Sequence, residues 1–401
     1  MKVSIIGQGY VGLTISAFAA AKHDVVGFDN SQKVVDRLNQ GISHIEGVDS
    51  EVIAKWAKEG RYVATTNGAD IKGSDIVVIA VPTPLTKDRK PDMSFIESAC
   101  KTIAENIDRP VLVINESTSF PGTVRNFIKP MIENLSVNKF EHLYAISPER
   151  VDPGRGDYNQ KNTPRLYAGL TPEASEKTRE FYSSFCDQLV EVSSPEVAES
   201  AKLFENTFRQ VNIALVNEFA QIAHKLGISV HETLDAANTK PYGFMKFTPS
   251  AGVGGHCIPV DPTYLAHVAE QLGAPSTFIE RANEVNLEMP VYIVDRVEAD
   301  NGGSLQGKSV LVVGVAYKPN VADVRETPAE IVIEELRKRG AVVAWHDDVV
   351  GTWQGETSSP LSGAEITIVV TLHDVVKQSD VLASAPYVFD TTGKVKGAKT
   401  L

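Results

Sequence analysis

The stretch Lys2-Val3-Ser4-Ile5-Ile6-Gly7-Gln8-Gly9-Tyr10-Val11-Gly12 decides the fold of this chain. A short apolar strand runs into a turn with three glycines, and a helical pattern follows at once. The glycines permit a tight turn and a close approach of the backbone to a pyrophosphate, while the helix offers free N–H groups and the positive end of its dipole. The expected dinucleotide cradle consists of Gly7, Gly9, Tyr10, Val11 and Gly12.

An acidic residue follows the second strand of this unit. Val25–Phe28 is a short apolar strand, and Asp29 comes directly after it, 17 residues beyond Gly12. A carboxylate at this point accepts hydrogen bonds from ribose hydroxyls and repels a 2′-phosphate, which favours NAD over NADP as the cofactor. Pro82 and Thr83 end a later strand at the same edge of the sheet, so we add them to the expected cofactor site. Taken alone, their segment is equally compatible with a stiff loop.

Short apolar segments alternate with helical patterns over the first part of the chain, which predicts a doubly wound α/β sheet. A long helix begins at Ser194-Pro195 and stops before Gly227, and helical patterns continue to about residue 300. After the linker Asn301-Gly302-Gly303 the α/β alternation resumes. The expected strands are Val3–Ile6, Val25–Phe28, Ile76–Val81, Val111–Asn115, Ser309–Val315, Ala341–Trp345, Glu365–Val370 and Tyr387–Asp390.

This layout predicts two Rossmann-like doubly wound domains joined by an all-α central domain with a long helix. We expect an N-terminal NAD-binding domain over residues 1–193, a central helical domain over 194–302 and a C-terminal Rossmann-like domain over 303–401. The long helix is apolar around most of its girth, so we expect it to be buried between domains or subunits.

The bulk composition restricts the classes of function. A net charge of −12 over 401 residues, with no run of Lys and Arg, argues against nucleic acid as a partner. Three cysteines without paired spacing indicate neither a disulfide framework nor a metal site, and hence a reducing compartment. The sequence has no signal-peptide pattern and no apolar run of the roughly 18 residues that cross a bilayer. We therefore expect a cytoplasmic protein with no membrane partner.

Cys257 is the candidate nucleophile, because it directly follows Gly252-Val253-Gly254-Gly255-His256. Glycines let a substrate approach the backbone and can aim N–H groups at an oxyanion. An accessible thiol can ionise to the thiolate that attacks. A cysteine on its own is more often a small buried hydrophobic residue, and that interpretation suits Cys100 and Cys186.

Lys202, Asn206 and Arg209 share one face of the long helix, because they lie four and then three residues apart. Polar side chains on a largely apolar helix cost free energy unless they have partners. They form either a solvated stripe or a set of groups that point at reacting oxygens, and the residue types do not choose between the two.

Several segments in order resemble one known family, the UDP-glucose/GDP-mannose dehydrogenases, which oxidise nucleotide sugars with NAD. The resemblance covers nearly the whole chain. Its motifs are GQGYVG at Gly7–Gly12, VPTP at Val81–Pro84, NEST at Asn115–Thr118, SPER at Ser147–Arg150, AKLFENTF at Ala201–Phe208, GVGGHCIPVDP at Gly252–Pro262 and GVAYKPNVADVRETP at Gly314–Pro328.

This resemblance implies a four-electron oxidation of a sugar C6 alcohol to a carboxylate through a thioester. The implied catalytic residues are Cys257 as nucleophile, Glu149 as general base, Thr118 to place the water, Lys202 and Asn206 for the oxyanion, and Asp261 to support the cysteine loop. Thr118 also joins the cofactor site. The implied substrate-binding residues are Glu149, Arg150, Lys202, Asn206, Tyr242, Phe244, Gly254, Lys318 and Arg325. The resemblance implies no metal, a UDP-sugar as substrate and a homodimer formed through the long helix.

The segments Pro84–Thr86, Ser147–Gly154 and Asn238–Met245 are most similar to the bacterial UDP-N-acetyl-D-mannosamine and UDP-N-acetyl-D-glucosamine 6-dehydrogenases. The chain departs from the family pattern at Ser119-Phe120, where a Val-Pro-like pair is common, and at Val34, where a lysine is common. Lys33 is adjacent to Val34 and is a candidate replacement. These departures leave the shape of the water site and the role of Lys33 open.

Three other functions remain as alternatives. The first is a UDP-glucose 6-dehydrogenase with the same mechanism. The second is a two-electron β-hydroxyacid dehydrogenase, which needs no thiol. The third is a nucleotide-binding regulator that has lost its chemistry, against which the joint presence of Cys257, Lys202, Asn206 and Glu149 argues.

Overall fold

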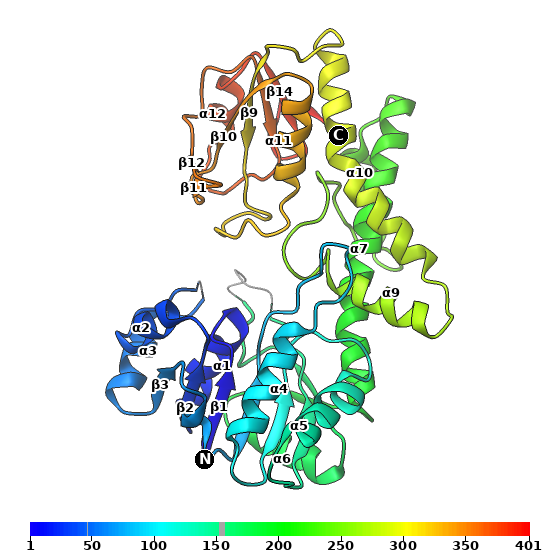
Figure 1. The fold of residues 1–401 in the computed structure, drawn as a ribbon. Helices are drawn as coiled ribbons and strands as arrows, with labels where there is room; N and C mark the ends of the chain where they lie inside the picture. Colours follow the sequence, from blue (N-terminus) through cyan, green and yellow to red (C-terminus); the bar gives the residue numbers. More distant parts are fainter. Residues whose placement is uncertain (46, 152–156) are drawn as a thin grey trace. The chain divides into compact units, whose positions relative to one another are not determined.

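The computed structural model describes residues 1–45, 47–151 and 157–401. The chain divides into two compact units, Met1–Phe204 and Glu205–Leu401, and the division falls within a single helix, α7 (Pro195–Leu226). Each unit contains one large β-sheet that is mainly or wholly parallel (Figure 1).

The sheet of the first unit has the order β3-β2-β1-β4-β5-β6-β7-β8. All its neighbouring strands are parallel except β6 and β7, which pair antiparallel. The strand order reverses between β1 and β4, which is where doubly wound sheets bind ligands. The strands are β1 Lys2–Ile6, β2 Asp24–Phe28, β3 Tyr62–Thr65, β4 Ile76–Ile79, β5 Leu112–Asn115, β6 Leu143–Ile146, β7 Arg165–Gly169 and β8 Leu189–Glu191.

Helices cover both faces of this sheet, so its central strands are buried on both sides. Ile76–Ile79 of β4, for example, is apolar and fully buried along its length, as expected for a parallel strand between two helical layers. The helices are α1 Tyr10–Ala19, α2 Gln32–Asn39, α3 Ser50–Lys58, η1 Gly68–Ile71, α4 Ser94–Asn106, η2 Val124–Ile128, α5 Lys129–Leu135 and α6 Pro172–Ser183.

The second unit contains a five-stranded parallel sheet with the order β10-β9-β13-β14-β15. This arrangement is the other common doubly wound order. The strands are β9 Ser309–Val313, β10 Val342–His346, β13 Ile366–Val369, β14 Tyr387–Asp390 and β15 Lys399–Thr400, and a short hairpin is formed by β11 Thr352–Trp353 and β12 Glu356–Thr357. The remaining helices are α8 Val230–Ala237, α9 Asp261–Gln271, α10 Thr277–Asp300, α11 Pro328–Lys338 and α12 Gln378–Ala383.

The second unit is one body because its helices and its sheet share a core. Ala220 of α7 and Met289 and Ile293 of α10 pack in the same buried cluster as Val312 of β9 and Ile333 of α11. The loop over residues 238–260, which contains no helix or strand, separates α8 from α9. Burial of these apolar side chains is the main source of stability for the unit.

The expected fold class is confirmed: two Rossmann-like sheets and a long helix, α7, are present where the sequence predicts them. All eight expected strands occur, most within one or two residues of the expected bounds. The sequence did not predict β3, β6, β7 and β8 of the first unit or the short strands β11, β12 and β15 of the second. Cys100 in α4 and Cys186 after α6 are buried, as expected.

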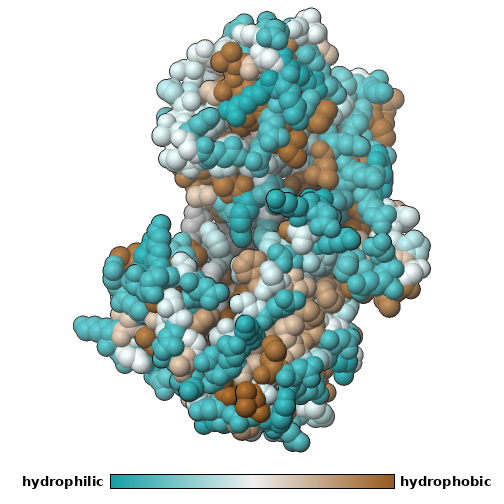
Figure 2. Space-filling view, in the orientation of Figure 1, coloured by the Kyte–Doolittle hydropathy of each residue, from teal (hydrophilic) through white to brown (hydrophobic). Residues whose placement is uncertain are grey.

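An apolar face of α7 is exposed. Phe208, Leu215, Ile222 and Leu226 are 41%, 62%, 47% and 64% exposed. Intervals of seven, seven and four residues place these four side chains on one face of the helix. The opposite face carries the buried Ala220 and its neighbours. The face of the protein that Figure 2 shows is largely hydrophilic, with apolar residues in separate patches.

Candidate functional site

The glycine turn after β1 has the geometry that a dinucleotide requires. Gly7 has φ of 92°, and a Cβ on it would lie 2.4 Å from the carbonyl oxygen of Ala80. A Cβ on Gly12 would lie 1.8 Å from the carbonyl oxygen of Gly7, so both positions require glycine. A Cβ on Gly9 would meet nothing within 4 Å. The space beside Gly9, at the N-terminus of α1, therefore suits a pyrophosphate.

Asp29 joins this turn to the end of β2. Its Oδ2 accepts a hydrogen bond from the Gln8 N–H at 2.9 Å, and its Oδ1 accepts one from the Ser31 N–H at 2.8 Å. The side chain is half-buried, so it remains within reach of a ribose. Gln8 itself is fully buried, and its Oε1 accepts from the hydroxyl of Tyr62 at 2.9 Å. Lys33 is exposed in the first turn of α2.

The loops after β4 and β5 lie at the same edge of the sheet and are tied together. The Val81 N–H donates to Ser117 Oγ at 2.9 Å, and Ser117 Oγ donates to the Val81 carbonyl at 2.8 Å. Thr83 and Thr118 are buried beside this link. Pro82 is exposed, and Tyr10 and Val11 are half-buried at the start of α1. The expected cofactor residues therefore share the carboxyl edge of β1, β4 and β5, and they fit NAD.

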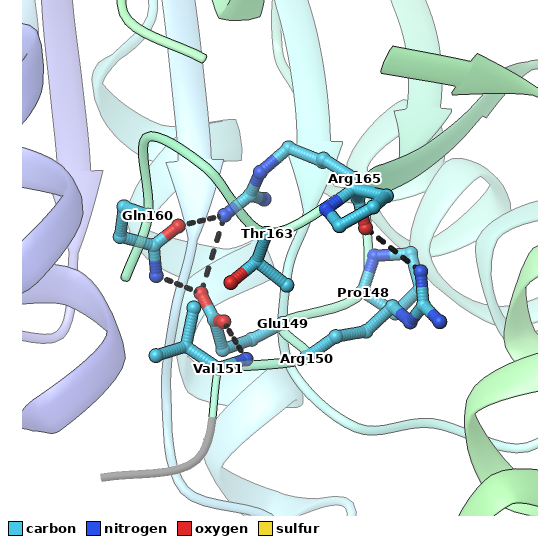
Figure 3. Close-up of a pocket in the computed structure, with 8 residues that line it drawn as sticks. Pro148, Glu149, Arg150, Val151, Gln160, Thr163 and Arg165 are labelled. Carbon is cyan, nitrogen blue, oxygen red and sulfur yellow. Dashed lines mark hydrogen bonds and ion pairs between the residues drawn. The ribbon is translucent and has the colours of Figure 1, made fainter. Parts of the chain in front are cut away.

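Glu149 lies in a buried polar cluster that the sequence did not reveal (Figure 3). The carboxylate is 8% exposed and accepts from the Val151 N–H at 2.6 Å, from the side-chain amide of Gln160 and from Arg165 Nη2 at 3.2 Å. Burial favours the neutral form of Glu149, but Arg165, Gln160 and the Val151 N–H outweigh it and hold its pKa below the ordinary value. Lys202, buried on α7, lowers this pKa further.

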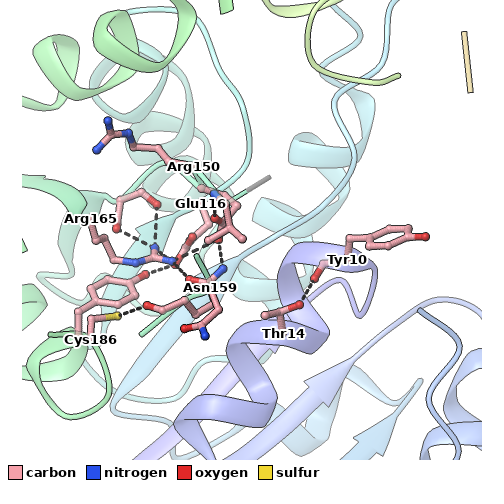
Figure 4. Close-up of polar contacts among 12 residues, drawn as sticks. Tyr10, Thr14, Glu116, Arg150, Asn159, Arg165 and Cys186 are labelled. Carbon is pink, nitrogen blue, oxygen red and sulfur yellow. Dashed lines mark hydrogen bonds and ion pairs between the residues drawn. The ribbon is translucent and has the colours of Figure 1, made fainter. Parts of the chain in front are cut away.

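Arg165, at the start of β7, connects Glu149 to a second carboxyl (Figure 4). Its Nη1 donates to Glu116 Oε1 at 2.7 Å and to Ser147 Oγ at 3.0 Å. The hydroxyl of Tyr182 also donates to Glu116 Oε1. Glu116 is fully buried, and burial raises its pKa. Glu116 belongs to the NEST segment, and a charged residue at the start of an apolar strand was the only sign of Arg165.

Arg150 is directed away from the Glu149 carboxylate. Its Nη1 donates to the Pro164 carbonyl at 2.7 Å, and Figure 3 shows the side chain extending toward that carbonyl. Asp152, Pro153 and Gly154, which belong to the segment that suggested an N-acetyl sugar, lie outside the described residues.

Glu199, one turn before Lys202 on α7, holds the loop that carries Thr118. Its carboxyl accepts from the Gly122 N–H at 2.6 Å and the Val124 N–H at 3.1 Å. Ser119, at the departure from the family pattern, donates to Glu199 at 3.4 Å. Burial raises the pKa of Glu199 to about 8, although the two backbone N–H groups oppose this shift.

Cys257 is exposed on its loop in the second unit. Its carbonyl accepts from the N–H of Asp261 at 2.8 Å, where α9 begins. The fully buried Asp261 accepts in turn from Asn206 Nδ2 of α7 at 2.6 Å. The structure therefore brings together Cys257, Asp261 and Asn206. Arg209, further along α7, is exposed.

The cysteine loop packs against the loop that follows β9. A Cβ on Gly254 would lie 2.8 Å from Tyr317 Cβ and 2.9 Å from the carbonyl oxygen of Glu326. The Gly255 N–H donates to the Arg325 carbonyl at 2.9 Å. Lys318 and Arg325 thus lie on the segment that supports the candidate nucleophile.

Arg325 is paired with a neighbouring carboxylate. Its Nε lies 3.0 Å from both oxygens of Asp323. Burial favours the neutral form of Asp323, but Arg325 outweighs it and lowers the pKa of this carboxyl, and His256 adds a smaller contribution in the same direction. His256 therefore lies near enough to Asp323 to favour its ionised form.

Asp347 and His373 hold the loop after β9 in place. The buried Asp347 Oδ2 accepts from the N–H groups of Val315 at 2.9 Å and Ala316 at 3.1 Å. His373 Nδ1 accepts from the Asn320 N–H at 2.8 Å, so its proton lies on Nε2, 3.0 Å from the Asp347 carboxylate. Burial opposes ionisation of Asp347, yet His373 and the backbone N–H groups lower its pKa to about 2.

This loop repeats the geometry of the first glycine turn. The Gly314 N–H donates to the His346 carbonyl at 2.8 Å, as the Gly7 N–H donates to Phe28 at 2.8 Å. Asp347 follows β10 as Asp29 follows β2, and both accept backbone N–H groups of the turn. The second acid, however, is buried against His373 and is closed to a ribose.

Tyr242 and Phe244 lie in the segment that precedes the cysteine loop and are 72% and 40% exposed. Lys240 Nζ lies 5.1 Å from the centre of the Tyr242 ring. In the described residues, no three His, Cys, Asp or Glu side chains form a group that could hold a metal ion. Nor does any helix in the same ranges have the length and apolarity to cross a membrane.

Sequence profiles of one family match most of the chain. The NAD binding domain of the UDP-glucose/GDP-mannose dehydrogenase family matches residues 1–186. The central domain of that family matches residues 196–288, and its UDP binding domain matches residues 311–396.

Individual relatives align with this chain over most of their length. UDP-N-acetyl-D-mannosamine dehydrogenase of Pyrococcus horikoshii is 35% identical over 387 residues, covering 94% of this chain and 90% of that protein. UDP-N-acetyl-D-glucosamine 6-dehydrogenase of Pseudomonas aeruginosa is 35% identical and covers 88% of this chain and 83% of the relative.

Solved structures agree with these matches. The P. horikoshii UDP-D-ManNAc dehydrogenase structure has a TM-score of 0.89 at 32% identity, covering 100% of this chain and 97% of that one. A UDP-glucose dehydrogenase structure from Pyrobaculum islandicum has a TM-score of 0.88 at 26% identity, covering 100% and 96%. The chain therefore belongs to the UDP-glucose/GDP-mannose dehydrogenase family and is an NAD-dependent dehydrogenase.

Proposed function

We propose that the protein oxidises the C6 alcohol of a UDP-N-acetylhexosamine, UDP-ManNAc or UDP-GlcNAc, to the uronate through a thioester on Cys257. The observation that carries this proposal is the exposed Cys257 on a glycine loop that packs against the segment bearing Lys318 and Arg325. The names of the most similar relatives support the N-acetyl sugar. UDP-glucose is the second candidate, supported by the P. islandicum structure.

The chain would comprise an NAD-binding domain over residues 1–193, a helical dimerisation domain over 194–302 and a nucleotide-sugar domain over 303–401. NAD would be held by Gly7, Gly9, Tyr10, Val11, Gly12, Asp29, Pro82, Thr83 and Thr118. When bound, NAD supplies the acceptor for the hydride lost in each oxidation. Lys318 and Arg325 would bind the UDP, while Arg150, Tyr242, Phe244 and Gly254 would contact the sugar.

Cys257 would act after the first oxidation. The alcohol loses a hydride and a proton to give the aldehyde, and the Cys257 thiolate adds to the aldehyde carbon, forming a carbon–sulfur bond. Loss of a second hydride from this adduct gives the thioester. Covalent capture divides a difficult oxidation into easier steps and retains the aldehyde. Lys202 and Asn206 would stabilise the oxygen that becomes negative, and Asp261 would hold the cysteine loop through its bonds to Asn206 and the Cys257 carbonyl.

Glu149 would then activate water, placed by Thr118. Water adds to the thioester carbon and gives its proton to Glu149, the carbon–sulfur bond breaks, and Cys257 leaves as the thiolate. The ionised state of Glu149 in its cluster supports this role, because only the carboxylate can take the proton.

The four exposed apolar side chains on one face of α7 support a homodimer formed through this helix, because exposed apolar surface commonly marks an interface.

The test is NADH production with UDP-GlcNAc, UDP-ManNAc, UDP-glucose and GDP-mannose, with identification of the acid formed. We expect two NADH for each N-acetyl sugar oxidised. We also expect Cys257→Ala to lose carboxylate formation by at least about a thousandfold, as other nucleophile deletions do. One NADH per sugar with release of free aldehyde, or normal turnover by Cys257→Ala, would refute the thioester. A clear preference for UDP-glucose would refute only the N-acetyl substrate.

A further inference from the structure

The buried cluster around Arg165 contains two carboxyl groups for one guanidinium. We propose that Arg165 is a positioning residue for Glu149, and that Glu116 anchors Arg165 as a protonated acid, so that Glu149 is the only carboxylate of the cluster. This inference rests on the proposed role of Glu149 in thioester hydrolysis. It adds a residue pair, Arg165 and Glu116, that acts through the general base without touching the substrate.

The contacts of the Arg165 guanidinium fix the orientation of this side chain. Nη1 binds Glu116 and Ser147, and Nη2 binds Glu149 and the side-chain oxygen of Gln160. The guanidinium carbon lies 4.5 Å from the centre of the Tyr182 ring. A planar fork with fixed donors can serve both carboxyls at once, which the single point charge of a lysine cannot do.

The same contacts direct the Glu149 carboxylate. Oε1 accepts from the Val151 N–H, while Oε2 accepts from Gln160 and Arg165. Donors on both oxygens leave little freedom for the side chain to rotate. Glu149 lies in a small recess lined in addition by Pro148, Thr163 and Pro164 (Figure 3). Without Arg165, the carboxylate would lose its ion pair with the guanidinium and one of its three donors.

The distribution of hydrogen-bond donors assigns the proton to Glu116. The side chains of Arg165, Glu116 and Glu149 are 4%, 0% and 8% exposed. A buried anion without enough hydrogen-bond donors is costly. Glu149 has donors on both oxygens, whereas both donors to Glu116, from Arg165 and Tyr182, reach the same oxygen. The other oxygen of Glu116, Oε2, is buried and has no hydrogen-bond partner.

The remaining groups around the cluster reinforce this assignment. Lys202 from α7 acts on Glu149 and favours its charged form. Tyr182 from α6 and Cys186 after it are buried and stay neutral, because burial raises the pKa of Cys186 to about 11 and that of Tyr182 well above its ordinary value. The shifts of the two carboxyls agree, since burial raises the pKa of Glu116 while the surrounding donors lower that of Glu149.

The first experiment compares Arg165→Lys, Arg165→Met and Glu149→Gln in stopped-flow assays with NAD and the UDP-sugar that the panel identifies. If Arg165 positions Glu149, Arg165→Lys forms about two NADH per active site in a first turnover. Its steady state is then at least about tenfold slower, and the thioester on Cys257 is detectable by mass. The KM for NAD stays within about twofold.

The acid limb of the pH profile of kcat moves to higher pH in Arg165→Lys, because the Glu149 carboxylate loses part of its stabilisation as an anion. Arg165→Met moves the acid limb of this profile to still higher pH. Arg125→Lys is the matched control, since the Arg125–Glu196 pair is exposed and lies outside the cluster.

The Glu149→Gln variant separates the positioning role of Arg165 from the proposed hydrolytic role of Glu149. If Glu149→Gln shows the burst but Arg165→Lys keeps the wild-type pH profile and steady-state rate, the positioning role is wrong and the hydrolytic role of Glu149 stands. If Glu149→Gln turns over normally, the proposed function of Glu149 itself fails. Should Arg165→Met not fold, Arg165→Lys alone decides, because it retains the charge.

Infrared difference spectroscopy tests the proton on Glu116. Wild-type protein at neutral pH should show the carbonyl stretch of a buried carboxylic acid, shifted by ¹³C labelling of glutamate and absent in Glu116→Gln. Absence of this band in the wild type would show that Glu116 is ionised and would overturn the assignment.

Discussion

The three cysteines differ in ways that one reagent can measure. Cys257 is exposed, whereas Cys100 and Cys186 are buried. Burial raises the pKa of Cys100 to about 12 and that of Cys186 to about 11. Since only the thiolate reacts, both buried thiols should be inert near neutral pH.

We therefore expect one equivalent of iodoacetamide to label the folded protein at Cys257, with loss of activity and protection by the UDP-sugar. Peptide mass spectrometry identifies the labelled residue, and unfolded protein, in which all three thiols react, is the control. Modification of Cys100 or Cys186 at a comparable rate in folded protein would contradict the burial of these thiols.

Individual residues also show where sequence reasoning succeeds. Gly7, Gly9, Gly12 and Asp29 could be predicted because their chemistry depends on local order along the chain, in which turn, helix and strand end follow one another. Arg165 could not, because its partner Glu116 is 49 residues away. The antiparallel pairing of β6 and β7 brings the start of β7 near Glu149. A single charged residue at the start of an apolar strand does not predict such a pairing.

At the scale of elements, helix α7 supports the Thr118 loop through Glu199. The raised pKa of Glu199, about 8, means that the folded protein keeps a proton that the unfolded chain releases near its ordinary pKa. Between these two values the folded state binds more protons, so this group makes the folded protein less stable as pH rises.

Glu199→Gln should remove this dependence, because glutamine resembles the protonated acid and does not ionise. We expect the Tm of Glu199→Gln minus the Tm of the wild type to increase as the pH rises from about 5 to about 8. Thermal unfolding across this range measures the shift, and other titrating groups cancel in the difference. A difference that stays constant with pH would count against a neutral Glu199.

The loop after β9 is another element whose position depends on one acid. Asp347 accepts from four backbone N–H groups, those of Val315, Ala316, Val349 and Val350. In Asp347→Asn an amide NH₂ would face at least one of these donors. Leaving buried donors unpaired costs about 1–3 kcal/mol.

We expect Asp347→Asn to unfold at lower temperature and to raise the KM for the UDP-sugar several-fold more than the KM for NAD, because the displaced loop carries Lys318. Steady-state kinetics with each substrate varied in turn measures both constants. An equal rise in both would indicate general loosening instead of a local effect on the nucleotide-sugar loop.

The strands show how element prediction depends on composition. β1, β2, β4 and β5 are apolar and follow clear turn signals, so the sequence predicts them. β8 has only three residues, which are mostly exposed. A short strand that buries little apolar surface leaves no distinct pattern.

At the scale of the whole molecule, the order of motifs carried more information than any single one. The cysteine loop, Asp261 and Asn206 are joined in the structure by hydrogen bonds. The support of that loop by Tyr317 and Arg325 came only from the fold, because glycine positions in the sequence do not say which neighbour they face.

The apolar face of α7 leads to a prediction about assembly. Leu215 is 62% exposed, so Leu215→Lys should cost the isolated chain little stability. In a homodimer formed through α7, a lysine there would be buried against apolar side chains. We expect wild-type protein to sediment as a dimer and Leu215→Lys to shift toward monomer. Lys225→Leu, on the same helix, adds no charge and should leave the dimer intact. A monomeric wild type would refute the interface.

The two glycine turns, after β1 and after β9, share one backbone frame but present different acids to their surroundings. Asp29 is half-buried, and Asp347 is closed off by His373. The partners of the strand-end acid, and not the course of the main chain, therefore distinguish an accessible carboxylate after β2 from one that supports a neighbouring loop after β10.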